Sequence, residues 1–121
     1  MKKLLGMALL VLLSHVVLAQ VDSTKKEKQK MTAEKILTKH PLGKSGRNIS
    51  RHKYVTMEQA IVKSLRNKEL THTELFNQLN KSLKGRFPDN ISWYAETVKL
   101  DLEARKTIER TSSRPQKYRL K

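Results

Sequence analysis

Residues 91–106, ISWYAETVKLDLEARK, decide the fold of this chain. Apolar side chains recur here at spacings of three and four residues, which place them along one side of an α-helix. The stripe consists of Ile91, Tyr94, Ala95, Val98 and Leu102, and is widened by Trp93 and Leu100. The pattern predicts a helix over residues 91–106 that forms the centre of a hydrophobic core.

The opposite side of this predicted helix is polar and charged, with Ser92, Glu96, Lys99, Glu103 and Lys106 at spacings of three and four residues. We expect this side to face solvent, with Glu96–Lys99 and Glu103–Lys106 as ion pairs worth about 0.2–0.5 kcal/mol each. A carboxylate that enters the major groove of DNA meets phosphate repulsion unless it accepts a hydrogen bond from cytosine. This helix face is therefore a poor match for DNA.

Two further helices are predicted upstream. Residues 51–66 repeat apolar side chains at helical spacing behind Ser50, a candidate N-cap. Thr71 and Glu74 then form a capping box, the signature of a helix start, and Gly85 is a typical helix stop. The buried faces of these helices are predicted to be Tyr54, Met57, Ile61 and Leu65 in the first, and Leu75, Phe76, Leu79 and Leu83 in the second.

The regions outside the three helices are predicted to be less regular. Residues 107–110 and 116–120 alternate apolar and polar side chains around a turn, which predicts a β-hairpin. Residues 32–49 contain Pro41, Gly43 and Gly46 and are predicted to form an arm or loop. The fold class is thus mainly α with a small C-terminal β-hairpin, in the order of a winged helix-turn-helix. Ion pairs that orient the third helix against the hairpin are predicted among Asp101, Arg105, Glu109 and Arg110.

The chain resembles a family of small, functionally uncharacterised bacterial proteins with a winged-helix-like fold. The resemblance is carried by residues 93–105, WYAETVKLDLEAR, by residues 108–110, IER, and by the basic strand that follows. A weaker match lies in His40-Pro41, Gly43-Lys44 and Asn48-Ile49. Together these cover roughly residues 33–120. The resemblance implies the winged-helix-like fold and brings no activity or site with it.

The N-terminus has the three parts of a secretory signal. Lys2 and Lys3 precede an apolar run over residues 4–18, and small Ala19 stands before Gln20. We predict a signal peptide over residues 1–19 with cleavage between Ala19 and Gln20, a flexible charged spacer over 20–32 and a winged-helix-like domain over 33–121. The alternatives are an uncleaved anchor, for which the run is short, and translation from Met31, which would make the protein cytoplasmic. Export to the periplasm or the extracellular space is favoured.

The residue inventory argues against an enzyme. The chain has no Cys, and His40, His52 and His72 are scattered without a partner at metal-ligand spacing. Asp101 and Glu103 are two residues apart and point about 200° away from each other on a helix, so they cannot act as an acid–base pair. We therefore predict a non-enzymatic protein with no catalytic residue, no metal, no cofactor and no small-molecule substrate.

The net charge of +15, or +13 once Lys2 and Lys3 are removed, points to an anionic partner. The predicted polyanion-binding residues are the hairpin cations Arg110, Arg114, Lys117 and Arg119. Two hypotheses follow: an exported basic adaptor that binds a partner protein or an anionic envelope surface, and, as the alternative, a winged-helix nucleic-acid-binding protein. Export favours the first, because an exported domain does not meet the chromosome.

Overall fold

The structure is a computed structural model that describes residues 25–27, 29 and 34–121 of the chain. The predicted signal peptide over residues 1–19, its cleavage between Ala19 and Gln20, and the alternative start at Met31 fall outside these residues. They remain predictions. No helix of the described residues is long and apolar enough to cross a membrane.

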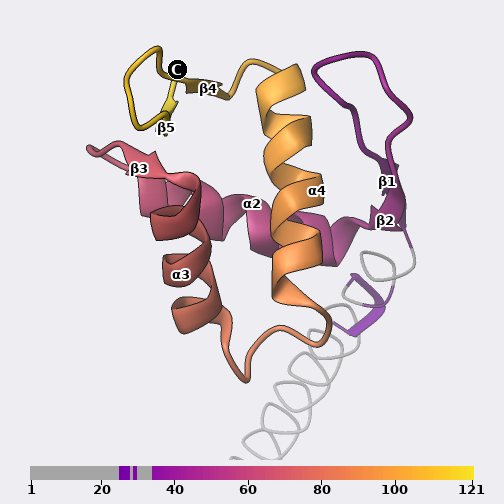
Figure 1. Cartoon of the computed structure of the whole chain (residues 1–121). Coiled ribbons are helices and arrows are strands. Elements are labelled where there is room, and N and C mark those ends of the chain that lie inside the picture. The colour runs from indigo at the N-terminus through magenta and orange to yellow at the C-terminus, as the bar shows by residue number, and fades with distance from the viewer. Residues whose placement is uncertain (1–24, 28, 30–33) are drawn as a thin grey trace, which may run out of the picture.

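The domain mixes three long helices with two small antiparallel sheets (Figure 1). The helices are α2 (Arg51–Leu65), α3 (His72–Leu83) and α4 (Ile91–Ala104), and α4 crosses α2 with α3 to one side. One sheet pairs β1 (Lys35–Leu37) with β2 (Asn48–Ser50). The other has the order β3-β5-β4 and consists of β3 (Leu70–Thr71), β4 (Ile108–Arg110) and β5 (Lys117–Leu120).

The helices begin where the sequence predicts. The Ser50 hydroxyl accepts a hydrogen bond from the Lys53 amide, and the capping box of Thr71 and Glu74 is present in both directions. The hydrogen bond from the Thr71 amide, followed by that from the Thr71 side chain, lowers the pKa of the Glu74 carboxyl. Gly85 follows α3 with a positive φ of 73°, as a helix stop requires.

Helix α4 ends at Ala104, two residues earlier than predicted. Lys106 has a positive φ of 64°, and its amide donates to the Glu103 carbonyl. The Thr107 amide donates to the Leu102 carbonyl. These two bonds form a Schellman motif, in which the residue at the left-handed position is normally glycine. The chain turns at Lys106 into β4, which antiparallel pairing joins to β5 as the predicted C-terminal hairpin.

The hydrophobic core lies between the three helices. Leu79 and Val98 are fully buried, as the helical periodicity predicts, and so are Met57, Ile61 and Leu75. Trp93, in contrast, is 44% exposed and meets the Tyr94 ring edge-on. The domain is a mixed α/β fold of helices and two small antiparallel sheets, so the prediction of a mainly helical domain with small β elements is confirmed in part.

Two β elements were not predicted. The arm, which we define as residues 35–50, is a hairpin rather than a loop: Ile36 pairs with Ile49, and Ile49 is buried. The Thr38 amide donates to the Arg47 carbonyl at 2.8 Å, and the Thr38 hydroxyl accepts from the Arg47 amide at 2.8 Å. The second element is β3, which adds a strand to the C-terminal hairpin. Strands of two or three residues are too short to show a period in the sequence.

The predicted solvent-facing side of α4 is wrong at two positions. Lys99 is 1% exposed and Glu103 is 8% exposed, because the C-terminal hairpin covers them. The predicted pair of Glu103 with Lys106 is replaced by pairs of Glu103 with Lys99 and Arg110. The Glu96–Lys99 pair is present at 3.5 Å.

Candidate binding surface

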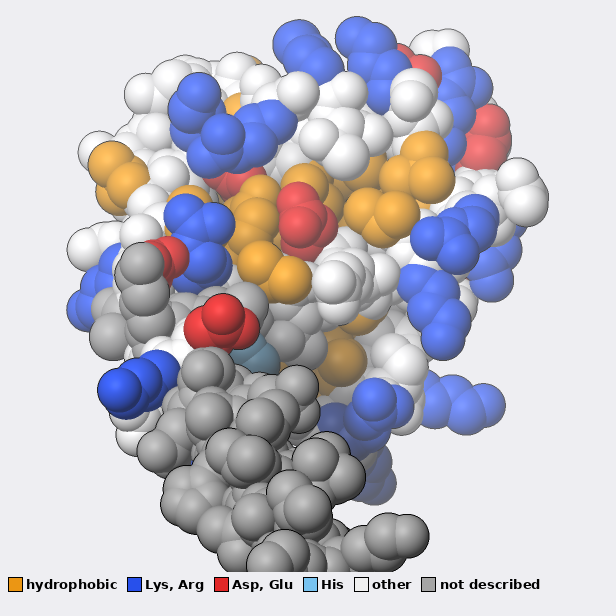
Figure 2. All heavy atoms as spheres, turned by 180° about the vertical axis from the view of Figure 1, so that it is seen from behind, with side chains coloured by type: hydrophobic (Ala, Val, Ile, Leu, Met, Phe, Trp, Pro, Cys, Tyr) orange, Lys and Arg blue, Asp and Glu red, His pale blue; other side chains and the backbone are white. Residues whose placement is uncertain are grey.

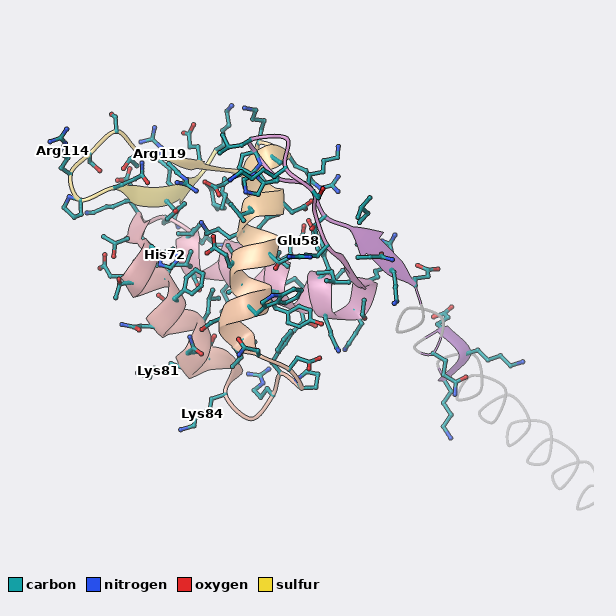
Figure 3. All side chains as sticks on the ribbon, turned by 45° about the vertical axis from the view of Figure 1, so that its right-hand side comes forward. Glu58, His72, Lys81, Lys84, Arg114 and Arg119 are labelled. Atoms are coloured by element: carbon teal, nitrogen blue, oxygen red, sulfur yellow. The ribbon has the colours of Figure 1, made fainter. Side chains whose placement is uncertain are left out.

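The four predicted polyanion-binding residues all lie on the C-terminal hairpin. Arg110 is on β4, Lys117 and Arg119 are on β5, and Arg114 is in the loop between the two strands. Arg114 and Arg119 project from this end of the molecule, far from Lys81 and Lys84 at the end of α3 (Figure 3). The sequence prediction thus selected residues that share one element.

Two of the four, Arg110 and Arg119, are held by internal ion pairs. The Arg110 guanidinium makes a two-pronged contact with the nearly buried Glu103 carboxylate. Arg119 contacts Glu109 at 2.9 Å and Glu69 at 3.2 Å. Hydrogen bonding to these carboxylates raises the pKa of both guanidinium groups. Both arginines therefore hold the hairpin in place, and less of their charge is available to a ligand.

Arg114 and Lys117 are different, because neither has an ion-pair partner among the described residues. Arg114 is exposed and Lys117 is half-buried. The same absence of a described partner applies to Lys39, Lys44, Lys106 and Lys121, all exposed. Among the described residues, Lys35, Arg47, Lys63, Arg66, Lys68, Lys81, Lys84 and Arg86 also have no ion-pair partner. We call the six cations of the arm tip, the turn after α4 and the C-terminal hairpin the free cations.

A buried charged cluster attaches the hairpin to α4. The Lys99 ammonium donates to the Tyr118 hydroxyl at 3.1 Å and lies 3.6 Å from the Glu103 carboxylate. The Lys99 ammonium and the Arg110 guanidinium lie 4.5 Å and 5.4 Å from the centre of the Tyr118 ring. At the outer end of the cluster, His72 contacts Glu96 at 3.2 Å. Apart from the spacing of Glu96, Lys99 and Glu103 on α4, no sequence pattern predicts this cluster.

A second buried group, Asp101, attaches the arm. Its carboxylate accepts a hydrogen bond from the Lys39 amide at 2.7 Å, another from the Tyr54 hydroxyl, and a third from the Arg105 guanidinium at 2.8 Å. Asp101 is fully buried and Tyr54 is 6% exposed. Burial and the contact with Asp101 raise the pKa of the Tyr54 hydroxyl above its usual value. The predicted Asp101–Arg105 pair is thus confirmed, and its further role is to fix the arm.

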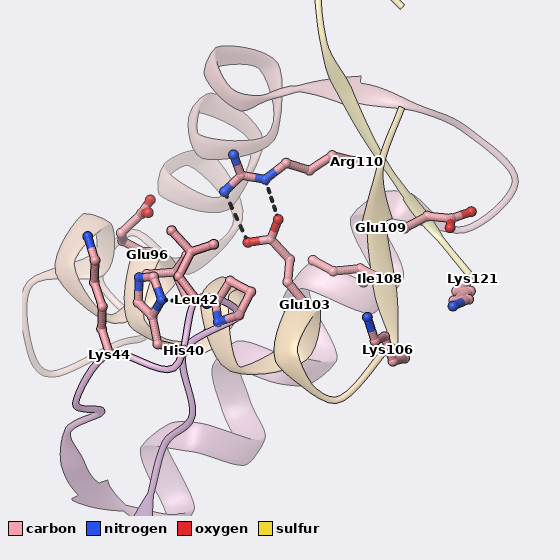
Figure 4. Close-up of a pocket in the computed structure, with 12 residues that line it drawn as sticks. His40, Leu42, Lys44, Glu96, Glu103, Lys106, Ile108, Glu109, Arg110 and Lys121 are labelled. Carbon is pink, nitrogen blue, oxygen red and sulfur yellow. Dashed lines mark hydrogen bonds and ion pairs between the residues drawn. The ribbon is translucent and has the colours of Figure 1, made fainter. Parts of the chain in front are cut away.

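A groove of about 610 Å³ runs between the arm, α4 and β4 (Figure 4). Leu42 and Lys44 border it from the arm, and Lys106 and Lys121 border it from the C-terminal side. Its carboxylates are all engaged: Glu103 with Arg110 and Lys99, Glu109 with Arg119, and Glu96 with Lys99 and His72. The charge that the groove offers to a ligand is therefore positive.

The tip of the arm, the end of α4 and the hairpin loop lie at one end of the molecule (Figure 1). We call this the basic end. Its exposed free cations are Lys39, Lys44, Lys106, Arg114 and Lys121, and Arg110 and Arg119 are exposed there within ion pairs. On the face seen in Figure 2, Lys and Arg side chains lie around the margin, and apolar and acidic side chains lie nearer the middle. Within residues 25–27, 29 and 34–121, no three His, Asp or Glu side chains are grouped to hold a metal ion.

Comparison with known proteins confirms the part of the resemblance that concerns a family of unknown function. A model of a protein family of unknown function, DUF6958, matches residues 35–118. The match includes the arm, the three helices and most of the C-terminal hairpin. No curated protein and no solved structure matches the chain. The chain is thus a member of DUF6958, a family of unknown function.

Proposed function

We propose that this protein is an exported, non-enzymatic binding module that attaches to an anionic surface of the cell envelope through its basic end. One observation carries the proposal. The free cations come from three separate segments of the chain, the arm, the turn after α4 and the C-terminal hairpin, and these segments meet at one end of the molecule. The nearby carboxylates Glu103 and Glu109 are engaged in internal ion pairs.

Such a surface suits a partner that carries repeated negative charge. Exposed lysines and arginines without local partners attract anions at long range and lose that attraction as salt rises. Their contacts with a charged surface are worth about 1 kcal/mol per cation near an anionic membrane. Binding of this kind requires no fixed ligand geometry, which agrees with cations that stand on a loop tip and on turns.

A second candidate function, nucleic-acid binding, is favoured by the topology. After the arm, the elements follow the order helix, strand, helix, helix, strand, strand, and the three-stranded sheet has the order β3-β5-β4. We infer a winged-helix-like arrangement from this order. In winged helices of the DNA-binding type, the helix equivalent to α4 enters the major groove.

The composition of α4 makes base recognition the weaker candidate. Lys99 is buried, and the outward positions Ser92, Trp93 and Glu96 carry no cation. The arm lies beside the same helix, with Lys39 and His40 next to Leu100. Any contact with nucleic acid is therefore expected to involve phosphates and to be blind to sequence.

The test compares two double variants that remove the same charge from opposite ends. Arg114→Gln with Lys117→Gln should weaken binding to vesicles containing an anionic phospholipid roughly 10- to 30-fold at low salt. Lys81→Gln with Lys84→Gln, at the far end of α3 (Figure 3), should leave it within about twofold. Equal losses in the two variants would mean that net charge, and not the basic end, controls binding.

Location and ligand class are tested separately. The protein isolated from its native cell should begin at Gln20, and a start at Met31 would favour the nucleic-acid alternative.

Titration with several duplex DNA sequences at two salt concentrations should give similar affinities, with a salt slope of about −0.9 per phosphate neutralised. A strong preference for one sequence would overturn the envelope proposal.

A further inference from the structure

The arm differs from the rest of the surface in combining exposed apolar side chains with positive charge. Three large apolar residues among those described are exposed, and two of them, Leu37 at 68% and Leu42 at 76%, lie on the arm. Residues 35–50 also contain Lys35, Lys39, Lys44 and Arg47 and no acidic residue. One exposed leucine needs no explanation, but two within a cationic hairpin form a local pattern.

The two leucines border the same cationic surface. Leu42 lines the groove of Figure 4, and Leu37 lines a neighbouring hollow. Both hollows are also lined by Pro41, Lys44 and Lys106. Exposed apolar side chains and lysines therefore lie together over one continuous region at the basic end.

The tip of the arm is held rigidly in its exposed position. The Gly43 amide donates to the His40 carbonyl at 3.0 Å, and Gly43 has a φ of 73° that suits glycine. The Leu42 amide donates to the His40 ring at 3.1 Å. At the base of the tip, the Lys39 amide is bound to buried Asp101. Leu42 thus stays exposed although a flexible loop could fold it onto the domain.

We propose that the arm is a membrane-docking element, in which Leu42 enters the interface of an anionic lipid bilayer while Lys39, Lys44 and Lys106 contact the lipid phosphates. This inference rests on the proposed function and names its partner as lipid. Cations beside an apolar side chain match the two layers of an anionic bilayer, the charged headgroups and the acyl boundary beneath them. A soluble polyanion offers only the first.

The experiment measures binding of the protein, in the processed form in which it is isolated, to two probes. One is vesicles of phosphatidylcholine with phosphatidylglycerol, and the other is duplex DNA, a polyanion without an apolar layer. Leu42→Ser should weaken vesicle binding about 3- to 10-fold, because the buried apolar area is lost. It should leave DNA binding unchanged, since all charges remain. Lys44→Gln should weaken both by about fivefold.

A fluorescent reporter tests insertion directly. In a Trp93→Phe background, Leu42→Trp should show a blue shift in emission when anionic vesicles are added, and no shift with DNA. Arm docking is overturned if Leu42→Ser binds vesicles as tightly as the unmodified protein, if it weakens DNA binding equally, or if the tryptophan does not shift. Each of these results leaves the envelope proposal standing when the Arg114/Lys117 variant still loses vesicle binding. If the Arg114/Lys117 variant binds vesicles with normal affinity and Leu42→Ser binds them weakly, the result supports docking through the arm. It also shows that the hairpin cations do not take part in binding.

Discussion

The arm and the C-terminal hairpin are two β elements attached to the same helix, α4, in different ways. The arm meets α4 through one polar contact, in which the buried Asp101 carboxylate accepts from the Lys39 amide. The two bonds between Thr38 and Arg47 close the arm on itself. The hairpin is held by side chains, through Lys99, Glu103 and Arg110 around Tyr118. The polar attachment of the arm depends on one acceptor, whereas that of the hairpin is divided among several charged groups. A single substitution at Asp101 should therefore loosen the contact of the arm with α4, although Ile49 stays buried in the core. A single substitution in the hairpin cluster should have a smaller effect.

The largest expected effect is that of Asp101→Ala. This change leaves the buried Tyr54 hydroxyl and the Lys39 amide without their acceptor, while the partly exposed Arg105 guanidinium is solvated. It should lower the free energy of unfolding by about 2–4 kcal/mol. Urea denaturation measures it. Asp101→Asn is the control, because an amide oxygen still accepts from the Lys39 amide, and it should cost less. A loss below about 1 kcal/mol for the alanine variant would show that Asp101 is not the attachment point of the arm.

The hairpin should respond more mildly to Lys99→Met. Methionine fills a similar volume, and Glu103 keeps its contact with Arg110, so we expect a loss of about 1–3 kcal/mol. Amide hydrogen exchange should rise in β4 and β5 and stay unchanged in the arm. Lys44→Met, at an exposed position, is the matched control and should leave stability unchanged. Faster exchange in both elements would contradict the separation of the two attachments.

The pH dependence of the arm attachment provides a third comparison. The pKa of Tyr54 is raised in the folded state, so the stability contributed by its protonated form is complete below pH 10. It is lost as pH rises from 10 towards the folded-state value. Unfolding at pH 9, 10 and 11 should show a decline of at most about 1.4 kcal/mol per pH unit above 10. Tyr54→Phe should reduce that decline, because the titrating hydroxyl is removed. Identical pH profiles for the unmodified protein and Tyr54→Phe would refute the role of this hydroxyl.

The smallest effect is expected at the turn between α4 and the hairpin. Lys106→Gly should stabilise the protein by up to about 1 kcal/mol, because glycine adopts the left-handed conformation without the steric cost of a side chain. The same change should weaken vesicle binding, since a free cation is removed. Thermal unfolding and vesicle titration measure the two effects. Asn67→Gly, at the equivalent left-handed position after α2, should alter stability without altering binding.

The sequence predicts the parts of this domain that depend on local chemistry. The capping box of Thr71 and Glu74, the stop at Gly85 and the buried faces of the helices are all determined by neighbours along the chain. The burial of Lys99 and Glu103 is different. Helical spacing marks a charged residue as exposed, and only partners from β4 and β5 make the buried position favourable.

The candidate surface could be predicted only in part for the same reason. The hairpin cations were visible as a cluster in the sequence, but their ion pairs were not, because Arg110 and Arg119 find Glu103 and Glu69 through tertiary contacts. The Lys39 amide of the arm meets the carboxylate of Asp101 on α4, 62 residues away along the chain. No local pattern predicts such a contact.

The two glycines of the arm predict how the sequence should vary among members of the family. A side chain at Gly46 would place its first carbon 1.6 Å from the Thr38 carbonyl oxygen, so any replacement must separate the two strands. Gly43 has open space around it and is restricted only by its positive φ, which asparagine also adopts. Relatives that keep a closed arm should therefore be invariant at the position of Gly46 and alternate between glycine and asparagine at that of Gly43. In relatives that carry another residue at the position of Gly46, the sequence of the whole arm should also differ.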